Sequence, residues 1–446
     1  IKTVKEELRK IPRKGIGYGI LNYLSSEALE DKDNHPTLSF NYLGQWDNNI
    51  SQEKLFAFAQ ESPGLSASDK NLLHFLAINS EIKEGILKLS FTYSKNHYYD
   101  KTLDALSHNF INRLKQLIQH CCQQNNFGYT PSDFNLAHLT QSDLDATFKD
   151  ISHIENIYPL SPMQSGLLFQ TLYAPESNTY FVQSIYELQG DIDLSILKQA
   201  WQKVSDHHPI LRTGFAWEKL AHPLQYVLES VVVPFKTENW ETLEEQEREE
   251  KLEAFLQKDR KMGFDLRKAP LFRLFLIQYT KDKYYLVWSQ HHILFDGWCL
   301  PIILGDVLKA YEDIKEKRIV HLKTPRAYRD YIDWLQQQDL NKAETFWKNY
   351  LASLEEPTHL SFKDIIEENK EKNKEKNKEK NYDTYSIVFS IEETEALKSF
   401  ASQYHLTLNT LIQGAVGTVL KTYTQQQEVV MGVTVSGRNI NLPGIE

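Results

Sequence analysis

The sequence has few cysteines, no long apolar run and no excess of basic charge, and each shortage excludes a class of protein. Its 446 residues include three cysteines, Cys121, Cys122 and Cys299, too few for a disulfide framework, so we expect a reducing, cytoplasmic setting. No apolar run approaches the ~20 residues of a membrane-spanning helix. Acidic residues outnumber basic ones by 60 to 50, and the net charge of −10 argues against a general nucleic-acid binder.

The chain nevertheless carries enough apolar material to fold. Hydrophobic residues make up 41% of it and aromatic residues 12%, which excludes a wholly disordered chain. At roughly 150 residues per domain, the length favours about three domains. The first residues read Ile-Lys-Thr-Val-Lys-Glu-Glu, which is neither a signal peptide nor a start methionine, so we expect an excerpt from a longer chain.

Hydrophobic periodicity predicts strands alternating with helices. Apolar and polar residues alternate over 87–93, which indicates a half-buried strand, and apolar residues recur every three to four positions over 103–121, which indicates an amphipathic helix. The turn-rich sequence around 125–133 marks a boundary, and a short helix is expected at 142–148.

The same alternation continues after Ile154. We expect helices at 194–204 and 300–311, and a hairpin formed by strands at 272–276 and 284–290 around a polar turn. Alternating strands and helices place the chain in the α/β or α+β class.

The last part of the chain contains a low-complexity segment. Residues 367–381 consist largely of Asn-Lys-Glu-Lys repeats, which favour a solvated loop over an isolated helix. Beyond it, Ser390 and Glu393 form a capping box that opens a helix, and a second helix is expected at 408–420. Residues 429–435 are expected to form a buried strand.

The strongest local signal is the sequence His-His-Ile-Leu-Phe-Asp-Gly-Trp at 291–298. Adjacent side chains of a strand point to opposite faces, so only one of His291 and His292 can face a given cavity at the strand's end. A histidine there, titrating near neutral pH, suits a general base or a hydrogen-bonding orienter.

Asp296 in this motif would need a cation if it is buried, because an unpaired buried carboxylate is costly, and Arg212 is the expected partner. The alternative is a satisfied core histidine beside a helix cap, the commoner case for an isolated pair. A second doublet, His207 and His208, has no Asp-Gly at the matching spacing. Because Pro209 holds His208 extended, we interpret that doublet as structural.

His-His-x-x-x-Asp-Gly with a trailing tryptophan resembles the active-site motif of nonribosomal peptide synthetase condensation domains, shared with chloramphenicol-acetyltransferase-like acyltransferases. Four more stretches stand in that family's order: Ser-Pro-Met-Gln-Ser-Gly-Leu-Leu-Phe at 161–169, His-Pro-Ile-Leu-Arg-Thr-Gly-Phe at 208–215, Tyr-Arg-Asp-Tyr-Ile-Asp-Trp at 328–334 and Val-Thr-Val-Ser-Gly-Arg at 433–438. Together they make the resemblance highly specific.

The first segment resembles a homologous domain. Pro-Arg-Lys-Gly-Ile-Gly-Tyr-Gly at 12–19 and Phe-Asn-Tyr-Leu-Gly-Gln at 40–45 are similar to the last two motifs of epimerization domains. The alternative is simple glycine-rich turns; a dinucleotide-binding loop is disfavoured because no βαβ pattern surrounds the glycines. The epimerization domain's own His-His motif is absent, so this segment is not expected to epimerise a substrate alone.

The resemblance implies chloramphenicol-acetyltransferase-like lobes, each a mixed sheet flanked by helices, paired in a V around a tunnel. It divides the chain into the C-terminal lobe of an epimerization domain (1–125), a linker (126–153), the N-terminal lobe of a condensation domain (154–335) and the start of its C-terminal lobe (336–446), which holds loop 367–381. Adenylation and carrier-protein motifs are absent, so we expect an excerpt of a longer synthetase.

The resemblance also implies the chemistry. The acceptor's α-amine would attack a carrier-bound donor thioester and form a peptide bond. His292 would be catalytic, as a base or a positioner of the amine, and the backbone N–H of Gly297 would lie near the developing oxyanion. Structural roles at the active site fall to His291, Asp296, Arg212 and Trp298.

No cofactor or metal is expected to bind the chain directly, because substrates would arrive on the 4′-phosphopantetheine of upstream and downstream peptidyl carrier domains. Adenylation and epimerization domains of the same synthetase would be further partners, but not nucleic acid or a membrane. An epimerization lobe directly before the condensation unit implies a D-configured donor and an L acceptor. Two alternatives stay open: an inert fragment offering a carrier-docking or inter-domain surface, and a freestanding coenzyme A acyltransferase, which the epimerization lobe disfavours.

Overall fold

The computed structural model describes residues 1–25, 36–45, 75–83, 85–122, 128–175, 178–354, 356–360 and 384–446. The low-complexity segment 367–381 and the start of the boundary predicted around 125–133 therefore lie outside the described residues. Contacts divide the chain into two units, Ile1–Ile332 and Asp333–Glu446.

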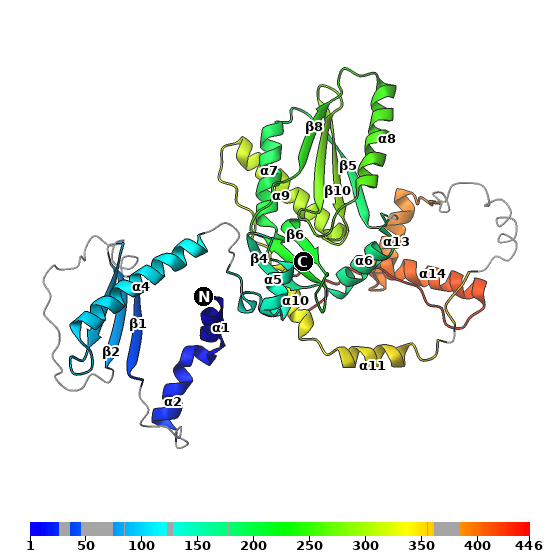
Figure 1. The fold of residues 1–446 in the computed structure, drawn as a ribbon. Helices are drawn as coiled ribbons and strands as arrows, with labels where there is room; N and C mark the ends of the chain where they lie inside the picture. The colour runs from blue at the N-terminus through cyan, green and yellow to red at the C-terminus, as the bar shows by residue number, and fades with distance from the viewer. Residues whose placement is uncertain are drawn as a thin grey trace. The chain divides into compact units, whose positions relative to one another are not determined.

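In its described residues, the first unit begins with a three-stranded sheet and three α-helices (Figure 1). In chain order these elements are α1 (Lys2–Lys10), α2 (Ile16–Leu24), β1 (Leu38–Gln45), β2 (Leu76–Lys83), β3 (Ile86–Tyr93) and α4 (Asp100–Cys121). The strands lie in the order β1-β2-β3, with β2 parallel to β1 and antiparallel to β3. Phe110 of α4 lies edge-on to Phe91 of β3, with ring centroids 6.3 Å apart. Strand β3 and helix α4 confirm the predictions at 87–93 and 103–121.

Residues 128–153 share a core with a second three-stranded sheet. The elements are the 3₁₀ turns η2 (Pro131–Asp133) and η3 (Asn135–Ala137), helix α5 (Gln141–Thr147) and strands β4 (Ile154–Pro159), β6 (Thr213–Ala216) and β7 (Leu224–Leu228). The strands are antiparallel in the order β4-β7-β6. Phe134 and Phe148 pack into this core, where Phe148 lies edge-on to Tyr226. Burying each ring contributes roughly 1.5–3 kcal/mol, so this stretch folds onto the sheet.

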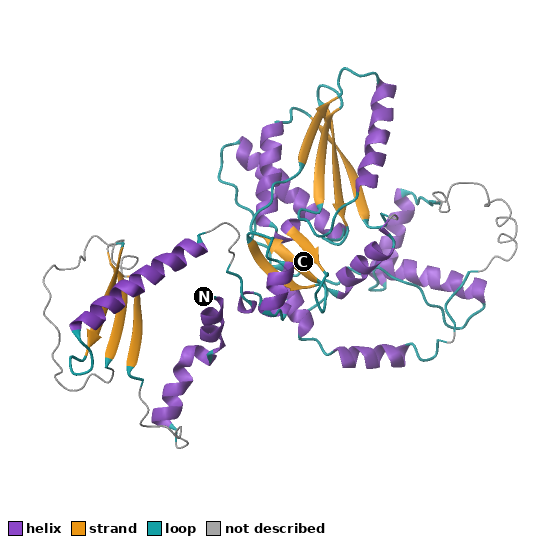
Figure 2. Cartoon of the chain, viewed as in Figure 1, coloured by secondary structure: helices purple, strands orange, loops and turns teal. Residues whose placement is uncertain are grey.

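A four-stranded sheet with helices on both faces carries the histidine motif (Figure 2). Its elements and neighbours are α6 (Pro162–Tyr173), β5 (Phe181–Gln189), α7 (Leu194–His207), β8 (Phe235–Asn239), α8 (Glu245–Met262), β9 (Phe272–Gln278), β10 (Lys283–His291) and α9 (Leu300–Lys315). The strand order is β5-β10-β9-β8. The antiparallel β9–β10 hairpin and helices α7 and α9 confirm the predictions for this region.

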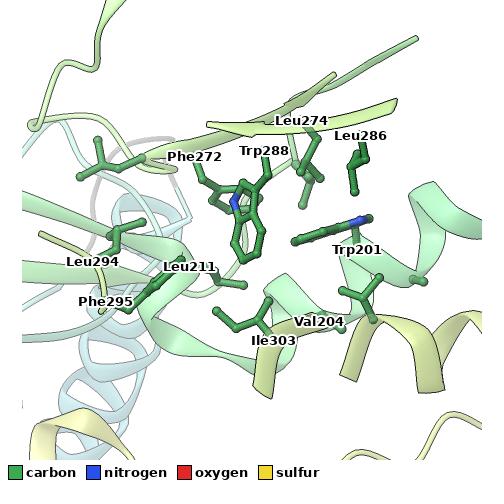
Figure 3. Close-up of a cluster of buried hydrophobic side chains, with 14 of the residues drawn as sticks. Trp201, Val204, Leu211, Phe272, Leu274, Leu286, Trp288, Leu294, Phe295 and Ile303 are labelled. Carbon is green, nitrogen blue, oxygen red and sulfur yellow. The ribbon is translucent and has the colours of Figure 1, made fainter. Parts of the chain in front are cut away.

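Strand β10 alternates its side chains between two cores. Trp288 faces α7 and α9, where it lies edge-on to Trp201 with centroids 5.0 Å apart (Figure 3). Val287 faces the opposite way and packs in the core that α8 covers. Leu294 and Phe295, just beyond the end of β10, return to the first core. The chain is therefore anchored by buried apolar side chains on both sides of His292.

Among the described residues of the second unit, the regular elements are helices. Helix α10 (Tyr328–Gln336) crosses into it, and its own helices are α11 (Leu340–Tyr350), α13 (Ile391–Gln403) and α14 (Leu408–Thr424). The capping box is confirmed, because the hydroxyl of Ser390 accepts from the N–H of Glu393 (3.1 Å). The buried strand predicted at 429–435 is wrong: the segment is irregular and Val435 is 76% exposed. A strand needs a paired neighbour, and the described part of this unit contains none.

Candidate active site

The end of β10 is held by backbone hydrogen bonds on both sides. The N–H of His291 donates to the carbonyl of Leu271 (3.0 Å), and the N–H of His292 donates to the carbonyl of Tyr180 (2.8 Å). The N–H of Leu294 then donates to the carbonyl of His291 (3.1 Å) and closes a turn. One histidine is turned inward by this arrangement and the other is exposed.

His291 is the inward histidine, and both of its ring nitrogens are engaged. Nδ1 accepts from the N–H of Ile293 (3.2 Å), which places the ring proton on Nε2, 3.3 Å from the hydroxyl oxygen of Thr171. That hydroxyl donates to the carbonyl of Leu167, so the ring ties β10 to α6. Burial, with a smaller effect from His292, lowers the pKa of His291 to about 4, and the ring stays neutral at physiological pH.

His292 is exposed, and its tautomer is set by the turn. Its Nδ1 lies 2.9 Å from the carbonyl oxygen of Phe295. A carbonyl oxygen only accepts, so Nδ1 carries the proton and the neutral ring keeps its lone pair on Nε2. Within the described residues, Nε2 has no hydrogen-bond partner. An exposed, oriented nitrogen of this kind can take up a proton from a bound substrate.

The loop after His292 brings Asp296, Gly297 and Trp298 to the start of α9. Oδ1 of Asp296 accepts from the N–H and the thiol of Cys299 and so caps the turn η6 (Gly297–Cys299). Gly297 is exposed, a Cβ there would meet no atom within 4 Å, and its φ is not left-handed, so the fold itself does not require glycine. Trp298 is 51% exposed.

The expected pairing of Arg212 with Asp296 is wrong. Arg212 is buried between α7 and β7, and its guanidinium instead bonds to three oxygens: the Glu155 carboxylate (2.6 Å), the Ser205 carbonyl (3.1 Å) and the Leu228 carbonyl. The Ser205 carbonyl needs this donor, because the residue four positions later is Pro209, which has no N–H. Arg212 thus supplies the hydrogen-bond donor that is missing at the C-terminal end of α7.

The second histidine doublet is used within the fold. His208 is buried and extended, and its Nε2 lies 2.7 Å from Oδ2 of Asp306 in α9. Burial lowers the pKa of His208, although the bond to Asp306 acts in the opposite direction. This ring joins the end of α7 to α9 and is turned away from solvent.

Two buried glutamines beneath the motif were not predicted from the sequence. Gln164 of α6 and Gln225 of β7 exchange amide hydrogen bonds of 2.9 and 3.2 Å. Nε2 of Gln164 also donates to the carbonyl of Ile293, the residue after His292 (3.3 Å). A local signal for Gln164 was present, because Ser-x-x-Gln is a capping-box sequence, and that box opens α6.

The described residues contain neither a metal centre nor a membrane-spanning helix. No group of three His, Cys, Asp or Glu side chains among them is placed to hold a metal ion. None of their helices is both long enough and apolar enough to cross a bilayer.

Comparison with known proteins decides the family. The model of the condensation domain family matches residues 1–140 and 154–446. The chain belongs to the condensation domain family. Over its full length this condensation-family chain is 38% and 40% identical to two linear gramicidin synthase proteins of Brevibacillus parabrevis. It is 36% identical, again over its full length, to bacitracin synthase 1 of Bacillus licheniformis.

The chain spans only 6% and 9% of the length of the two linear gramicidin synthase proteins and 8% of bacitracin synthase 1. Among solved structures it is similar to the first condensation domain of the calcium-dependent antibiotic synthetase in complex with a substrate analogue. That likeness has 15% sequence identity and a TM-score of 0.47, and it covers 61% of this chain and 63% of that one.

Proposed function

We propose that this condensation-family chain forms peptide bonds in nonribosomal peptide synthesis and that His292 is its catalytic residue. The observation that carries the proposal is the exposed imidazole of His292, whose Nδ1–H is tied to the carbonyl of Phe295 so that Nε2 is left to accept a proton. Membership of the condensation domain family supports the proposed substrates, a thioester donor and an amine acceptor.

The reaction joins an acceptor α-amine to the carbonyl carbon of a donor thioester. As the C–N bond forms, Nε2 of His292 takes up one proton from the amine nitrogen. The C–S bond then breaks, and the same proton neutralises the departing thiolate, so the histidine is regenerated. Acid–base help of this kind contributes roughly 100- to 10,000-fold to the rate.

The loop after His292 supports this step. The open space at Gly297 accommodates the developing oxyanion, with the backbone N–H of Gly297 as donor, and Asp296 shapes the loop through its cap on Cys299. His291 and Arg212 act on the fold rather than on the substrate, and Trp298 leaves half its surface open beside the loop.

The proposed partners are two peptidyl carrier domains, which present both substrates on 4′-phosphopantetheine, with adenylation and epimerization domains of the same synthetase. The motifs at 12–19 and 40–45 support an epimerization lobe in residues 1–125. A donor that leaves an epimerization step carries a D-configured last residue, so we propose D-donor to L-acceptor coupling.

A second candidate is an inert chain that offers a docking or inter-domain surface. It is favoured by the second unit, where Ala401 and Leu442 are the buried apolar residues among those described, while the aromatic side chains of α11 are exposed. A unit with so little buried surface of its own is suited to contacts with other domains.

The test is a condensation assay with carrier-bound donor and acceptor thioesters, read by mass spectrometry of the product. His292→Ala should lower the rate by roughly 100-fold or more without unfolding the chain. His207→Ala, in the structural doublet, is the matched control and should leave the rate unchanged.

Each outcome of this assay decides one point. A His292→Ala rate near that of the wild type would overturn the role of His292. Faster use of an L-terminated than a D-terminated donor would overturn the proposed stereochemistry. A wild-type chain that binds carrier domains but forms no product would favour the inert alternative. Gly297→Ala should keep the melting temperature, because the added methyl group would meet no atom of the protein within 4 Å. It should lower the rate, because the methyl group would occupy space that the substrate needs.

A further inference from the structure

Two glutamines lie in the interior of the first unit, where apolar side chains would cost less to bury. Gln225 has no exposed surface and Gln164 is 4% exposed. A buried amide is stable only when its donors and acceptors are satisfied. The hydrogen-bond partners of the two glutamines therefore indicate the role of each side chain.

Every hydrogen-bonding position of Gln164 is filled. Its Oε1 accepts from the N–H of Ser161 (3.0 Å) and from Nε2 of Gln225 (2.9 Å). Its Nε2 donates to Oε1 of Gln225 (3.2 Å) and to the carbonyl of Ile293 (3.3 Å). Rotating the amide by 180° would set two N–H groups against each other at Ser161, so this orientation is the one the network allows.

Gln225 pairs with Gln164 but is not needed to fix its orientation, which the N–H of Ser161 already sets. Its Nε2 donates to the carbonyl of Pro159 as well as to Gln164, so it joins β4, β7 and α6 (2.9 Å for both bonds). Among the described residues, its side chain makes no hydrogen bond to Ile293. The two amides are therefore alike in burial and in their mutual bonds, and they differ in their remaining partners: Ser161 and Ile293 for Gln164, and Pro159 for Gln225.

Ile293 is the residue whose backbone sets the turn that holds His292. Its N–H donates to Nδ1 of His291, and its carbonyl accepts from Gln164. The peptide groups on both sides of Ile293 are thus held from α6, one through the His291–Thr171 pair and one directly. The orientation of these peptides decides whether the Phe295 carbonyl can reach Nδ1 of His292.

We propose that Gln164 is a positioning residue for His292, acting through the carbonyl of Ile293. The proposal rests on the function proposed above for His292. Gln164 touches neither substrate nor the reacting atoms; it holds the turn in which the Nδ1–H of His292 meets the Phe295 carbonyl. A misplacement of about 1 Å in such a group can lower a rate by about 100-fold.

The test compares Gln164→Met with Gln225→Met. Both variants replace a buried amide by a side chain of similar volume and break the same glutamine pair, but only the first removes the donor to Ile293. In the condensation assay we expect Gln164→Met to lower kcat by about 10- to 100-fold with the KM of the acceptor unchanged, and Gln225→Met to keep kcat near the wild-type value. Equal losses in the two variants would overturn the proposal.

A second readout does not depend on activity. Long-range ¹⁵N–¹H NMR of histidine-labelled protein reports the tautomer of each histidine. The signal that is missing from the spectrum of His292→Ala is that of His292. We expect the Nδ1–H form in the wild type and in Gln225→Met, and a tautomer mixture in Gln164→Met. An unchanged Nδ1–H signature in Gln164→Met overturns the positioning role, whether or not the wild type is active. An inactive wild type would overturn the proposed function but not the positioning role. If the methionine variant does not fold, Gln164→Asn, one methylene too short to reach Ile293, replaces it in both experiments.

Discussion

Removing the guanidinium of Arg212 tests how much its bonds to one carboxylate and two carbonyls stabilise the fold. The side chain is 4% exposed, while its ionic partner Glu155 has a side chain 44% exposed. Its other partners are the carbonyls of Ser205, which is fully buried, and Leu228. Arg212→Met keeps most of the aliphatic stem and deletes all of these bonds at once.

The magnitude follows from those partners. A buried carbonyl left without a donor costs about 1–3 kcal/mol. The carbonyl of buried Ser205 loses its donor here, and so does that of partly buried Leu228. An ion pair with a partly exposed carboxylate adds about 0–1 kcal/mol. We therefore expect Arg212→Met to lower the free energy of unfolding by about 3 kcal/mol, and Glu155→Gln by about 0.5 kcal/mol.

The assay is urea unfolding followed by tryptophan fluorescence, for which Trp201 and Trp288 report on the core beside α7. The variants are Arg212→Met, Glu155→Gln and their combination. A loss below about 1 kcal/mol in Arg212→Met would refute the assignment of the guanidinium to buried carbonyls. A loss in Glu155→Gln as large as in Arg212→Met would show that the ion pair, not the donor at the end of α7, carries the stability.

Two further predictions concern pH and packing. Burial alone would raise the pKa of Asp133, but hydrogen bonds from Lys5 and Arg9 of α1 lower it to about 2. The stability that these bonds supply is therefore complete above about pH 4 and is lost as the pH falls toward 2. In urea unfolding at a series of pH values, Asp133→Asn should flatten that loss, and an unaltered slope would contradict the assignment. Gly214→Ala should cost about 1–3 kcal/mol of unfolding free energy, because a Cβ would lie 2.5 Å from the ring of buried Tyr226. Gly166 lies inside α6, and a Cβ there would meet no atom within 4 Å, so Gly166→Ala should raise the free energy of unfolding by about 0.5–1 kcal/mol. Equal losses in the two variants would exclude the Tyr226 contact as the cause.

The elements that were predicted from the sequence are those whose signal is local. The alternation in β3, the three-to-four spacing in α4 and α7, and the capping box at Ser390 each depend on residues within a few positions of one another. Such patterns can be recognised without the fold, because they depend on neighbouring residues alone.

The predictions that failed needed information from elsewhere in the chain. Residues 429–435 have the composition of a buried strand but no paired neighbour among the described residues. Arg212 was matched to Asp296 by charge alone, whereas its position at the end of α7, after a proline removed a helical donor, gave it Glu155 and two carbonyls. Charge predicts that a buried cation has partners, but packing decides which.

The sequence by itself determined the motif at 291–298, the family it indicates and the alternation of strands and helices, because each is written in neighbouring residues. Only the tertiary structure decided which ring is exposed, which nitrogen of His292 keeps its lone pair, and that Gln164 reaches Ile293 from 129 positions away. These depend on the packing of α6 against the end of β10. Hydrogen-bond partners in a protein interior are chosen by distance and direction in space, and neither is set by separation along the chain.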